Sequence, residues 1–199
     1  MLFIAHRINT IEELKQIPEK YGIEIDIRDE KNDLILVHDP FKTGEKLDDF
    51  LKYYNKSFII LNIKSERIEY RVIELLKKYN ITEYFFLDSS FPMIYQLNKI
   101  KENNIAIRFS EFESIESVVK VKDMIKWVWI DCFTKFPLDK ESYNKIIDAN
   151  LKICLVSPEL QKHNVKMIDD IKTIISNSKF NIHAICSKSY NVNKWTNLN

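Results

Sequence analysis

The stretch GIEIDIRDEKNDLILVHD, residues 22–39, decides how the rest of the sequence is interpreted. Its first half alternates: three isoleucines fall on one side of an extended chain, and Glu24, Asp26 and Arg28 fall on the other. A period of two residues is typical of a β-strand. Two carboxylates on one face repel each other unless a cation lies between them. We therefore expect this strand to direct its polar face toward a functional site.

The whole chain alternates short apolar runs with longer amphipathic ones, of which TIEELKQIPEKY begins with a Thr10–Glu13 capping box. Eight strand-then-helix units predict a compact (β/α)8 TIM barrel, an α/β fold in one domain over residues 1–199. The segment DLILVHD predicts a β-hairpin extension after the second strand. A doubly wound open sheet is the alternative. The eight expected strands are LFIAH (2–6), GIEIDIR (22–28), SFIILNIK (57–64), EYFFLDS (83–89), IAIRFS (105–110), WVWIDCF (127–133), KICLVS (152–157) and IHAICSK (182–188).

Polar residues near the carboxyl ends of these strands favour the barrel, because barrel enzymes keep their chemistry at that end. Four of them, on the later strands, could either line a substrate pocket or form buried ion pairs: Asp88, Arg108, Asp131 and Lys188. We expect Trp127 and Trp129 to pack in the core, and the tail SYNVNKWTNLN to be merely polar.

Composition narrows the class of protein. Hydrophobic residues make up 45% of the chain and charged residues 30%, which is typical of a soluble globular protein. The formal net charge is +1 without a basic block, so we expect no nucleic-acid partner. Only two glycines occur, which excludes glycine-rich phosphate loops. The three cysteines lack zinc-site spacing, no run is long enough to span a bilayer, and no signal peptide is evident. We expect a cytoplasmic protein, and the sequence leaves its oligomeric state open.

The carboxylates of Glu24 and Asp26 lie about 7 Å apart along one strand face. Hard oxygen ligands at this spacing suit Mg²⁺ or Ca²⁺, which would relieve their repulsion. Two histidines, His6 and His38, end neighbouring segments and can exchange protons near neutral pH. The pattern indicates phosphoester chemistry with a divalent metal as cofactor.

Two cations complete this picture, because Arg7 and Lys64 are suited to holding a phosphate. The expected partner is therefore a small phosphodiester substrate.

The motifs AHR, EIDIR and LVHDP, in this order and at these separations, resemble the signature of the glycerophosphodiester phosphodiesterases. The superfamily also includes phosphatidylinositol-specific phospholipases C and sphingomyelinase D-like enzymes. ILNIKSE and LDSSF are similar to the family's third- and fourth-strand segments. The resemblance implies a (β/α)8 barrel that hydrolyses a phosphodiester with a divalent metal. It implies these roles: general acid/base for His6 and His38, metal ligands for Glu24 and Asp26, and phosphate binding for Arg7 and Lys64.

Three departures set this chain apart from the family. Asn62 occupies the position of an expected acidic metal ligand; its amide oxygen can coordinate a hard cation, but the site loses one negative charge. Asp88 is a candidate to compensate. The loop after the first strand is cut to INT, and the insertion after His38-Asp39 shrinks to PFKTGEKL. Two alternatives to a hydrolase follow: a phosphodiester lyase that forms a cyclic phosphate, and a degenerate barrel that binds a phosphorylated ligand without turnover.

Overall fold

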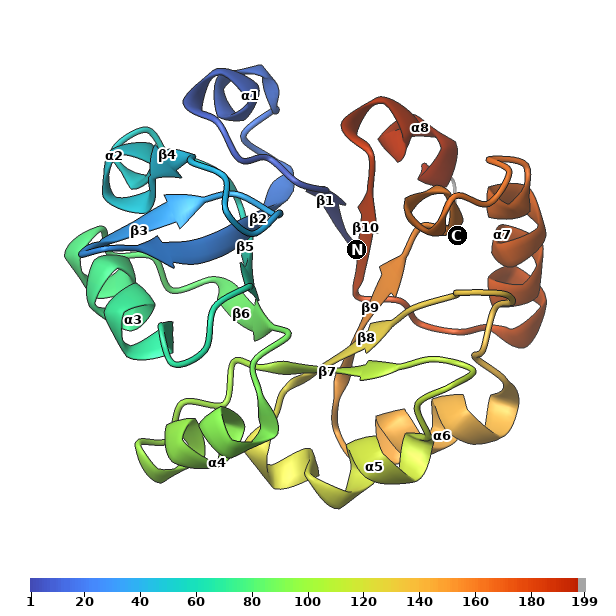
Figure 1. The fold of residues 1–199 in the computed structure, drawn as a ribbon. Coiled ribbons are helices and arrows are strands. Elements are labelled where there is room, and N and C mark those ends of the chain that lie inside the picture. Colours follow the sequence, from blue (N-terminus) through green and yellow to red (C-terminus); the bar gives the residue numbers. More distant parts are fainter. Residues whose placement is uncertain (197–199) are drawn as a thin grey trace.

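Parallel strands form a closed barrel in the computed structural model, which describes residues 1–196 (Figure 1). β1 pairs with both β2 and β10, and a bridge from Phe86 to Ile105 joins β6 to the segment before β7. The predicted (β/α)8 barrel is therefore confirmed, and the open doubly wound sheet is wrong. In order around the barrel the strands are β1 (Leu2–Ala5), β2 (Gly22–Glu30), β5 (Ile59–Ile63), β6 (Tyr84–Leu87), β7 (Ala106–Phe109), β8 (Trp127–Ile130), β9 (Lys152–Val156) and β10 (Ala184–Ser187).

Helices cover the outside of this barrel (Figure 1). Side-chain caps start several of them; the predicted capping box between Thr10 and Glu13 is present at the first. The helices are α1 (Ile11–Gln16), α2 (Leu47–Leu51), α3 (Glu69–Lys78), α4 (Phe91–Lys99), α5 (Ile115–Lys120), α6 (Lys140–Asp148), α7 (Met167–Ser178) and α8 (Val192–Trp195). Short 3-10 turns occupy Lys122–Met124, Pro158–Gln161 and Ser189–Asn191.

The alternation along the strands produces two separate apolar layers. One layer packs between the sheet and the helices and contains the three isoleucines of β2. The other fills the barrel interior with Phe58, Phe85, Trp127 and Trp129. The rings of Phe85 and Trp127 lie 5.0 Å apart, so the predicted packing role of the tryptophans is confirmed. Since the isoleucines face the helices, the alternate residues of β2 must point into the barrel.

The hairpin extension is confirmed as well. β3 (Asp33–Leu36) runs antiparallel to β2 and is followed by β4 (Glu45–Lys46), a short strand that the sequence did not predict. Gly44 is required at this turn, because a Cβ there would lie 2.2 Å from the carbonyl oxygen of Leu36. The Val37 N–H donates to the Asp26 carbonyl at 3.0 Å, which brings the end of β3 back beside the centre of β2.

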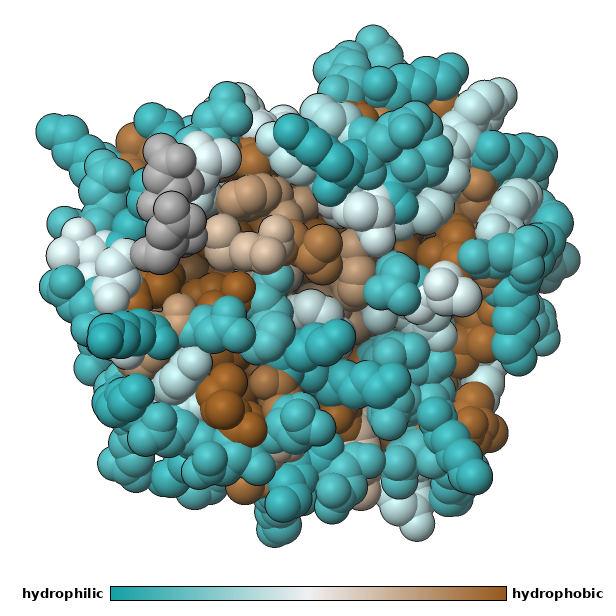
Figure 2. All heavy atoms as spheres, turned by 180° about the vertical axis from the view of Figure 1, so that it is seen from behind, coloured by the Kyte–Doolittle hydropathy of each residue, from teal (hydrophilic) through white to brown (hydrophobic). Residues whose placement is uncertain are grey.

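The prediction that the tail SYNVNKWTNLN is merely polar is wrong. Residues expected to be merely polar contain α8, and Trp195 is fully buried with its Nε1 donating to Ser157 Oγ at 2.8 Å. The last residues of the tail, 197–199, lie outside the described residues. Seen from behind, hydrophilic side chains cover most of the surface and hydrophobic ones show between them (Figure 2). Within residues 1–196 no helix combines the length and apolarity that crossing a bilayer requires.

Candidate active site

The predicted site residues converge at the carboxyl ends of β1, β2 and β5. His6 directly follows β1, while Glu24 and Asp26 belong to β2 and are fully buried. Asn62 on β5 is the register partner of Asp26, so these two side chains emerge side by side. Lys64 follows one residue after β5, with its Nζ 4.0 Å from Asp26 Oδ1. Strand pairing thus assembles residues that are up to 58 positions apart in sequence.

Hydrogen-bond donors surround the two buried carboxylates. Glu24 accepts from the Arg7 backbone N–H at 2.7 Å and from Asn62 Nδ2 at 2.8 Å. Asp26 accepts from the same Asn62 nitrogen at 3.2 Å and from Asn9 Nδ2 at 2.9 Å. Burial raises the pKa of Glu24, and burial together with the Glu24 charge raises the pKa of Asp26. Asn9 lies in the shortened INT loop, and its contact with Asp26 was not predicted from the sequence.

The donor set is compatible with a hard divalent cation. Within the described residues no three His, Cys, Asp or Glu side chains converge on a common metal position, so a third protein oxygen would come from a neutral group such as the Asn62 amide. Its Oδ1 is buried without a hydrogen-bond partner. A half-turn of this amide about its Cβ–Cγ bond would direct Oδ1 toward Glu24 and Asp26. Glu24, Asp26 and Asn62 are therefore the residues that would hold such a cation.

His6 lies between a cation and a carboxylate. Its Nδ1 is 3.2 Å from Lys188 Nζ, and its Nε2 is 3.8 Å from Glu24 Oε2. Burial lowers the pKa of His6 to about 3, with further contributions from Lys188 and Arg7. Lys188 directly follows β10 and therefore lies at the site. Among residues 1–196 it forms no ion pair with a carboxylate, so the ion-pair alternative does not apply to it.

His38 occupies the other side of the mouth on the hairpin loop. Its Nδ1 is 2.8 Å from Asp39 Oδ1, so this carboxylate orients the imidazole and leaves Nε2 available. Arg28 fixes the backbone here: Nε and Nη2 donate to the His38 carbonyl at 3.1 and 2.9 Å, and Nη1 donates to the Lys64 carbonyl at 2.7 Å. Arg28 thus ties the loops of two predicted site residues together. The alternation of β2 marked it as a polar residue but not for this role.

A chain of ion pairs covers the opposite part of the mouth. Asp88 accepts from Lys64 Nζ at 2.9 Å and from Arg108 Nη2 at 2.6 Å, and Arg108 Nη1 reaches Asp131 at 3.1 Å. Although burial opposes it, Arg108 and Lys64 lower the pKa of Asp88. Both Asp88 oxygens are therefore engaged by cations, and this residue does not replace the missing acid beside Glu24. For Asp88, Arg108 and Asp131 the structure favours ion pairs over an open substrate pocket.

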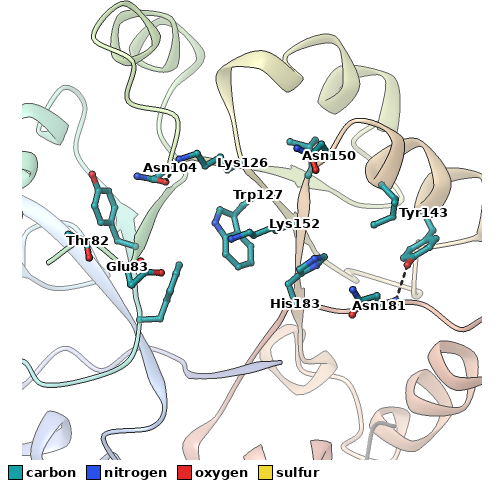
Figure 3. A pocket seen from close by; sticks show the side chains of 14 residues that line it. Thr82, Glu83, Asn104, Lys126, Trp127, Tyr143, Asn150, Lys152, Asn181 and His183 are labelled. Carbon is teal, nitrogen blue, oxygen red and sulfur yellow. Dashed lines mark hydrogen bonds between the residues drawn. The ribbon is translucent and has the colours of Figure 1, made fainter.

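Two cavities differ in their relation to these residues. One, of about 660 Å³, lies beside His6 and Arg7 and extends between α1 and α8 past Lys188 and Tyr190. Another, of about 690 Å³, contains none of the predicted site residues (Figure 3). Most of its lining residues precede or begin strands, Trp127 and His183 among them, so it lies at the amino-terminal end of the barrel. Barrel enzymes place their chemistry at the opposite end, so the cavity beside His6 is the one adjoining the candidate site.

The fold and the placement of these side chains define a (β/α)8 barrel with a cluster of acids, imidazoles and cations at its carboxyl mouth. No protein-family model and no curated protein sequence matches the chain. Three solved structures share the fold. An Agrobacterium tumefaciens protein assigned as a glycerophosphoryl diester phosphodiesterase has a TM-score of 0.72 at 11% identity, covering 98% of this chain and 96% of that one.

The other two structures agree with the first. A glycerophosphodiester phosphodiesterase from Agrobacterium tumefaciens has a TM-score of 0.65 at 13% identity, with 94% and 95% of the two chains covered. A glycerophosphoryl diester phosphodiesterase from Parabacteroides distasonis has a TM-score of 0.63 at 14% identity, with 97% and 85% covered. At these identities the likeness shows a shared fold. All three carry the name of the family that the sequence motifs resemble.

Proposed function

We propose that this chain is a phosphoric diester hydrolase acting on a glycerophosphodiester or a related phosphodiester. The observation that carries the proposal is the cluster of His6, Glu24, Asp26 and Lys64 at the carboxyl end of a barrel, with His38 on the adjoining hairpin. The shared fold of three proteins named as such phosphodiesterases supports it. A protein that only binds a phosphate has no need for two histidines beside paired carboxylates.

We propose further that Mg²⁺ or Ca²⁺ is held by Glu24, Asp26 and the amide oxygen of Asn62. When bound, such an ion polarises a phosphoryl oxygen and neutralises charge that develops during displacement. Arg7, Lys64 and Lys188 lie around the same position and suit the non-bridging phosphate oxygens. One neutral amide in place of a third acid reduces the charge of the ligand set, so we expect weak metal binding.

The two imidazoles divide the proton transfers. One imidazole takes the proton of the attacking oxygen, and the other donates a proton to the leaving oxygen. Asp39 accepts the Nδ1 proton of His38, so His38 presents the Nε2 lone pair and takes the role of the base. The attacking oxygen forms a new bond to phosphorus while the bond to the leaving alcohol oxygen breaks. Water as the attacking group gives hydrolysis directly, whereas a neighbouring substrate hydroxyl gives a cyclic phosphate first.

The test is turnover of glycerophosphocholine and glycerophosphoethanolamine by the purified protein, in Mg²⁺, in Ca²⁺ and in EDTA. We expect His6→Ala and His38→Ala each to lose about 10²-fold or more of kcat while circular dichroism shows an intact fold. His183→Ala is the matched control, because His183 lies at the far end of the barrel. Full activity in both site variants would refute the acid/base assignment. No turnover of any phosphodiester by the wild-type chain would favour the non-catalytic barrel.

Asn62 supports a second candidate, a phosphodiester lyase that stops at the cyclic phosphate. The amide Nδ2 already bridges both carboxylates, and an intramolecular hydroxyl attack needs less activation than attack by water. Phosphorus NMR of the product separates the two candidates, because a cyclic phosphate and a monoester resonate at distinct positions.

A further inference from the structure

The cavity at the amino-terminal end of the barrel has the size of a ligand site. Its volume of about 690 Å³ lies within the range of about 300–1,000 Å³ that small-molecule pockets occupy. A packed layer that includes Phe85, Trp127 and Trp129 fills the barrel interior between this cavity and the mouth. A ligand bound here would therefore lie apart from His6 and His38.

The indole of Trp127 forms the inner wall of the cavity. Only 4% of this residue is exposed, and its ring lies 5.5 Å from that of Phe58 and 5.0 Å from that of Phe85. In the part of the chain that the structure describes, Trp127 Nε1 donates no hydrogen bond to another residue, and Figure 3 shows the side chain at the centre of the polar residues that line the cavity. A buried indole N–H normally has a partner. An acceptor atom bound in the cavity would supply one.

Two lysines bring positive charge to the same wall. Lys152 is the register partner of Trp127, and its Nζ lies 5.3 Å from the centroid of the indole ring. Lys126 precedes Trp127, and its Nζ donates to Asn104 Oδ1 at 3.0 Å. The Lys152 backbone N–H donates to the Lys126 carbonyl at 2.9 Å, so the two lysines occupy adjacent positions. Among residues 1–196 neither pairs with a carboxylate, and such cations at one cavity attract an anion.

The other polar residues of the lining leave this charge in place. Glu83 is the one carboxylate among the lining residues, and it forms no ion pair with either lysine within residues 1–196. His183 adds no charge, because its Nδ1 accepts the Ile153 backbone N–H at 3.0 Å and so keeps its lone pair. Burial, reinforced by the Lys152 charge, lowers the pKa of His183 and keeps the ring neutral. The cavity therefore combines a net positive charge with an unpaired neutral donor.

We propose that this cavity binds a small organic phosphate monoester. A phosphate monoester carries close to two negative charges at pH 7 and three acceptor oxygens, which match two ammonium groups and one N–H. Lys126 and Lys152 pair with the phosphate, and Trp127 Nε1 donates to one of its oxygens. Tyr84 and Tyr143, partly exposed in the same lining, suit an apolar or aromatic organic group. The inference does not rest on the proposed phosphodiesterase function, since none of these residues belongs to the candidate active site.

The test is a titration of the ¹⁵N-labelled full chain with phenyl phosphate, followed by NMR at the assigned indole N–H signal of Trp127. We expect a saturable shift of this signal. Lys126→Ala and Lys152→Ala should each raise the Kd about fivefold, and both replace exposed side chains, so the fold should persist. Lys15→Ala is the matched control, because Lys15 Nζ also lies over an aromatic ring, that of Tyr53 at 4.7 Å, but does not line the cavity.

Two comparisons separate this site from other sources of a shift. Lys64→Ala should weaken phosphate binding at the mouth and leave the Trp127 response unchanged; loss of the response in this variant would place the ligand at the mouth and overturn the proposal. Benzoate, with a single negative charge, should bind about fivefold more weakly than phenyl phosphate, and equal affinity would overturn the assignment of a phosphate.

The absence of any Trp127 shift with phenyl phosphate would also overturn the proposal. So would an unchanged Kd in both Lys126→Ala and Lys152→Ala, or an equal loss of affinity in Lys15→Ala. None of these measurements depends on turnover, so a failure of the proposed phosphodiesterase function would leave their outcome unaffected.

Discussion

Replacing Asn62 by aspartate tests the centre of the site, because the two side chains have the same shape and differ in charge and donors. The substitution removes the Nδ2 donor that lies 2.8 Å from Glu24 and 3.2 Å from Asp26. Hydrogen bonds to charged groups contribute about 1.5–3 kcal/mol each. It also places a third carboxylate beside two buried ones. We expect the free energy of unfolding in EDTA to fall by about 3–5 kcal/mol, the range measured when buried ionic groups lose their partner.

A divalent cation should reverse much of this loss. Three carboxylates form a more anionic ligand set than two carboxylates and an amide, so the variant should bind Mg²⁺ or Ca²⁺ more tightly. An ion at a hundred times its dissociation constant stabilises the folded state by about 2.7 kcal/mol. Urea unfolding of the wild type and Asn62→Asp, each in EDTA, Mg²⁺ and Ca²⁺, measures both effects.

Asn55→Asp is the matched control for this experiment. Asn55 Nδ2 donates to Glu19 Oε1 at 2.6 Å in an exposed pair, so its replacement should cost at most about 1 kcal/mol and create no response to metal. Equal stability of Asn62→Asp and the wild type in EDTA would refute the inference that the Asn62 amide holds the carboxylates together. An Asn62→Asp variant that no divalent cation stabilises would refute the proposed metal position.

Three other changes test how the surrounding structure supports the mouth. Asp88→Asn should lower the free energy of unfolding by about 1–3 kcal/mol in urea titrations, because Lys64 loses its partner while asparagine keeps the φ of 59° accessible. Glu111→Gln should cost about 1 kcal/mol at pH 7. Burial raises the pKa of Glu111, but hydrogen bonds from the 133–135 loop outweigh it and lower this pKa to about 2. The contribution of the Glu111 carboxylate to stability is therefore complete above pH 4.5 and is lost as the pH falls toward 2. Gly44→Ala should cost about 1–3 kcal/mol, since its Cβ would collide with the Leu36 carbonyl; a wild-type melting temperature would contradict this.

The strands were predictable because each is short, apolar and bounded by polar residues. All eight expected strands are present; seven of them are one to three residues shorter than predicted, whereas β2 continues two residues further into the hairpin. β4 escaped prediction, since two charged residues carry no apolar periodicity. α8 was missed for a related reason: its four residues make one turn, and only Val192 and Trp195 among them are apolar.

The convergence of the site followed from the strand pattern, but its contacts did not. Register places Asp26 beside Asn62, and this could be inferred once both strands were assigned to neighbouring positions. The contact between Lys188 and His6 joins residues 182 positions apart and exists because the last strand closes on the first. Residue type and spacing therefore predicted which side chains meet. The closure of the barrel between β10 and β1 determines which atom of His6 faces the Lys188 ammonium.

Two of the three sequence differences noted above lie in loops, whereas Asn62 lies on strand β5. The strands are held by neighbours on both sides, so Glu24 and Asp26 keep their positions whatever the loops contain. The shortened INT loop nevertheless contributes Asn9, which donates to Asp26 and accepts from its backbone N–H at 2.9 Å. This short loop thus covers the Asp26 carboxylate with an amide. Both neutral amides, Asn9 and Asn62, replace charge near the acids with hydrogen-bond donors, which stabilises the buried pair without a cation and makes weak metal binding the expected consequence.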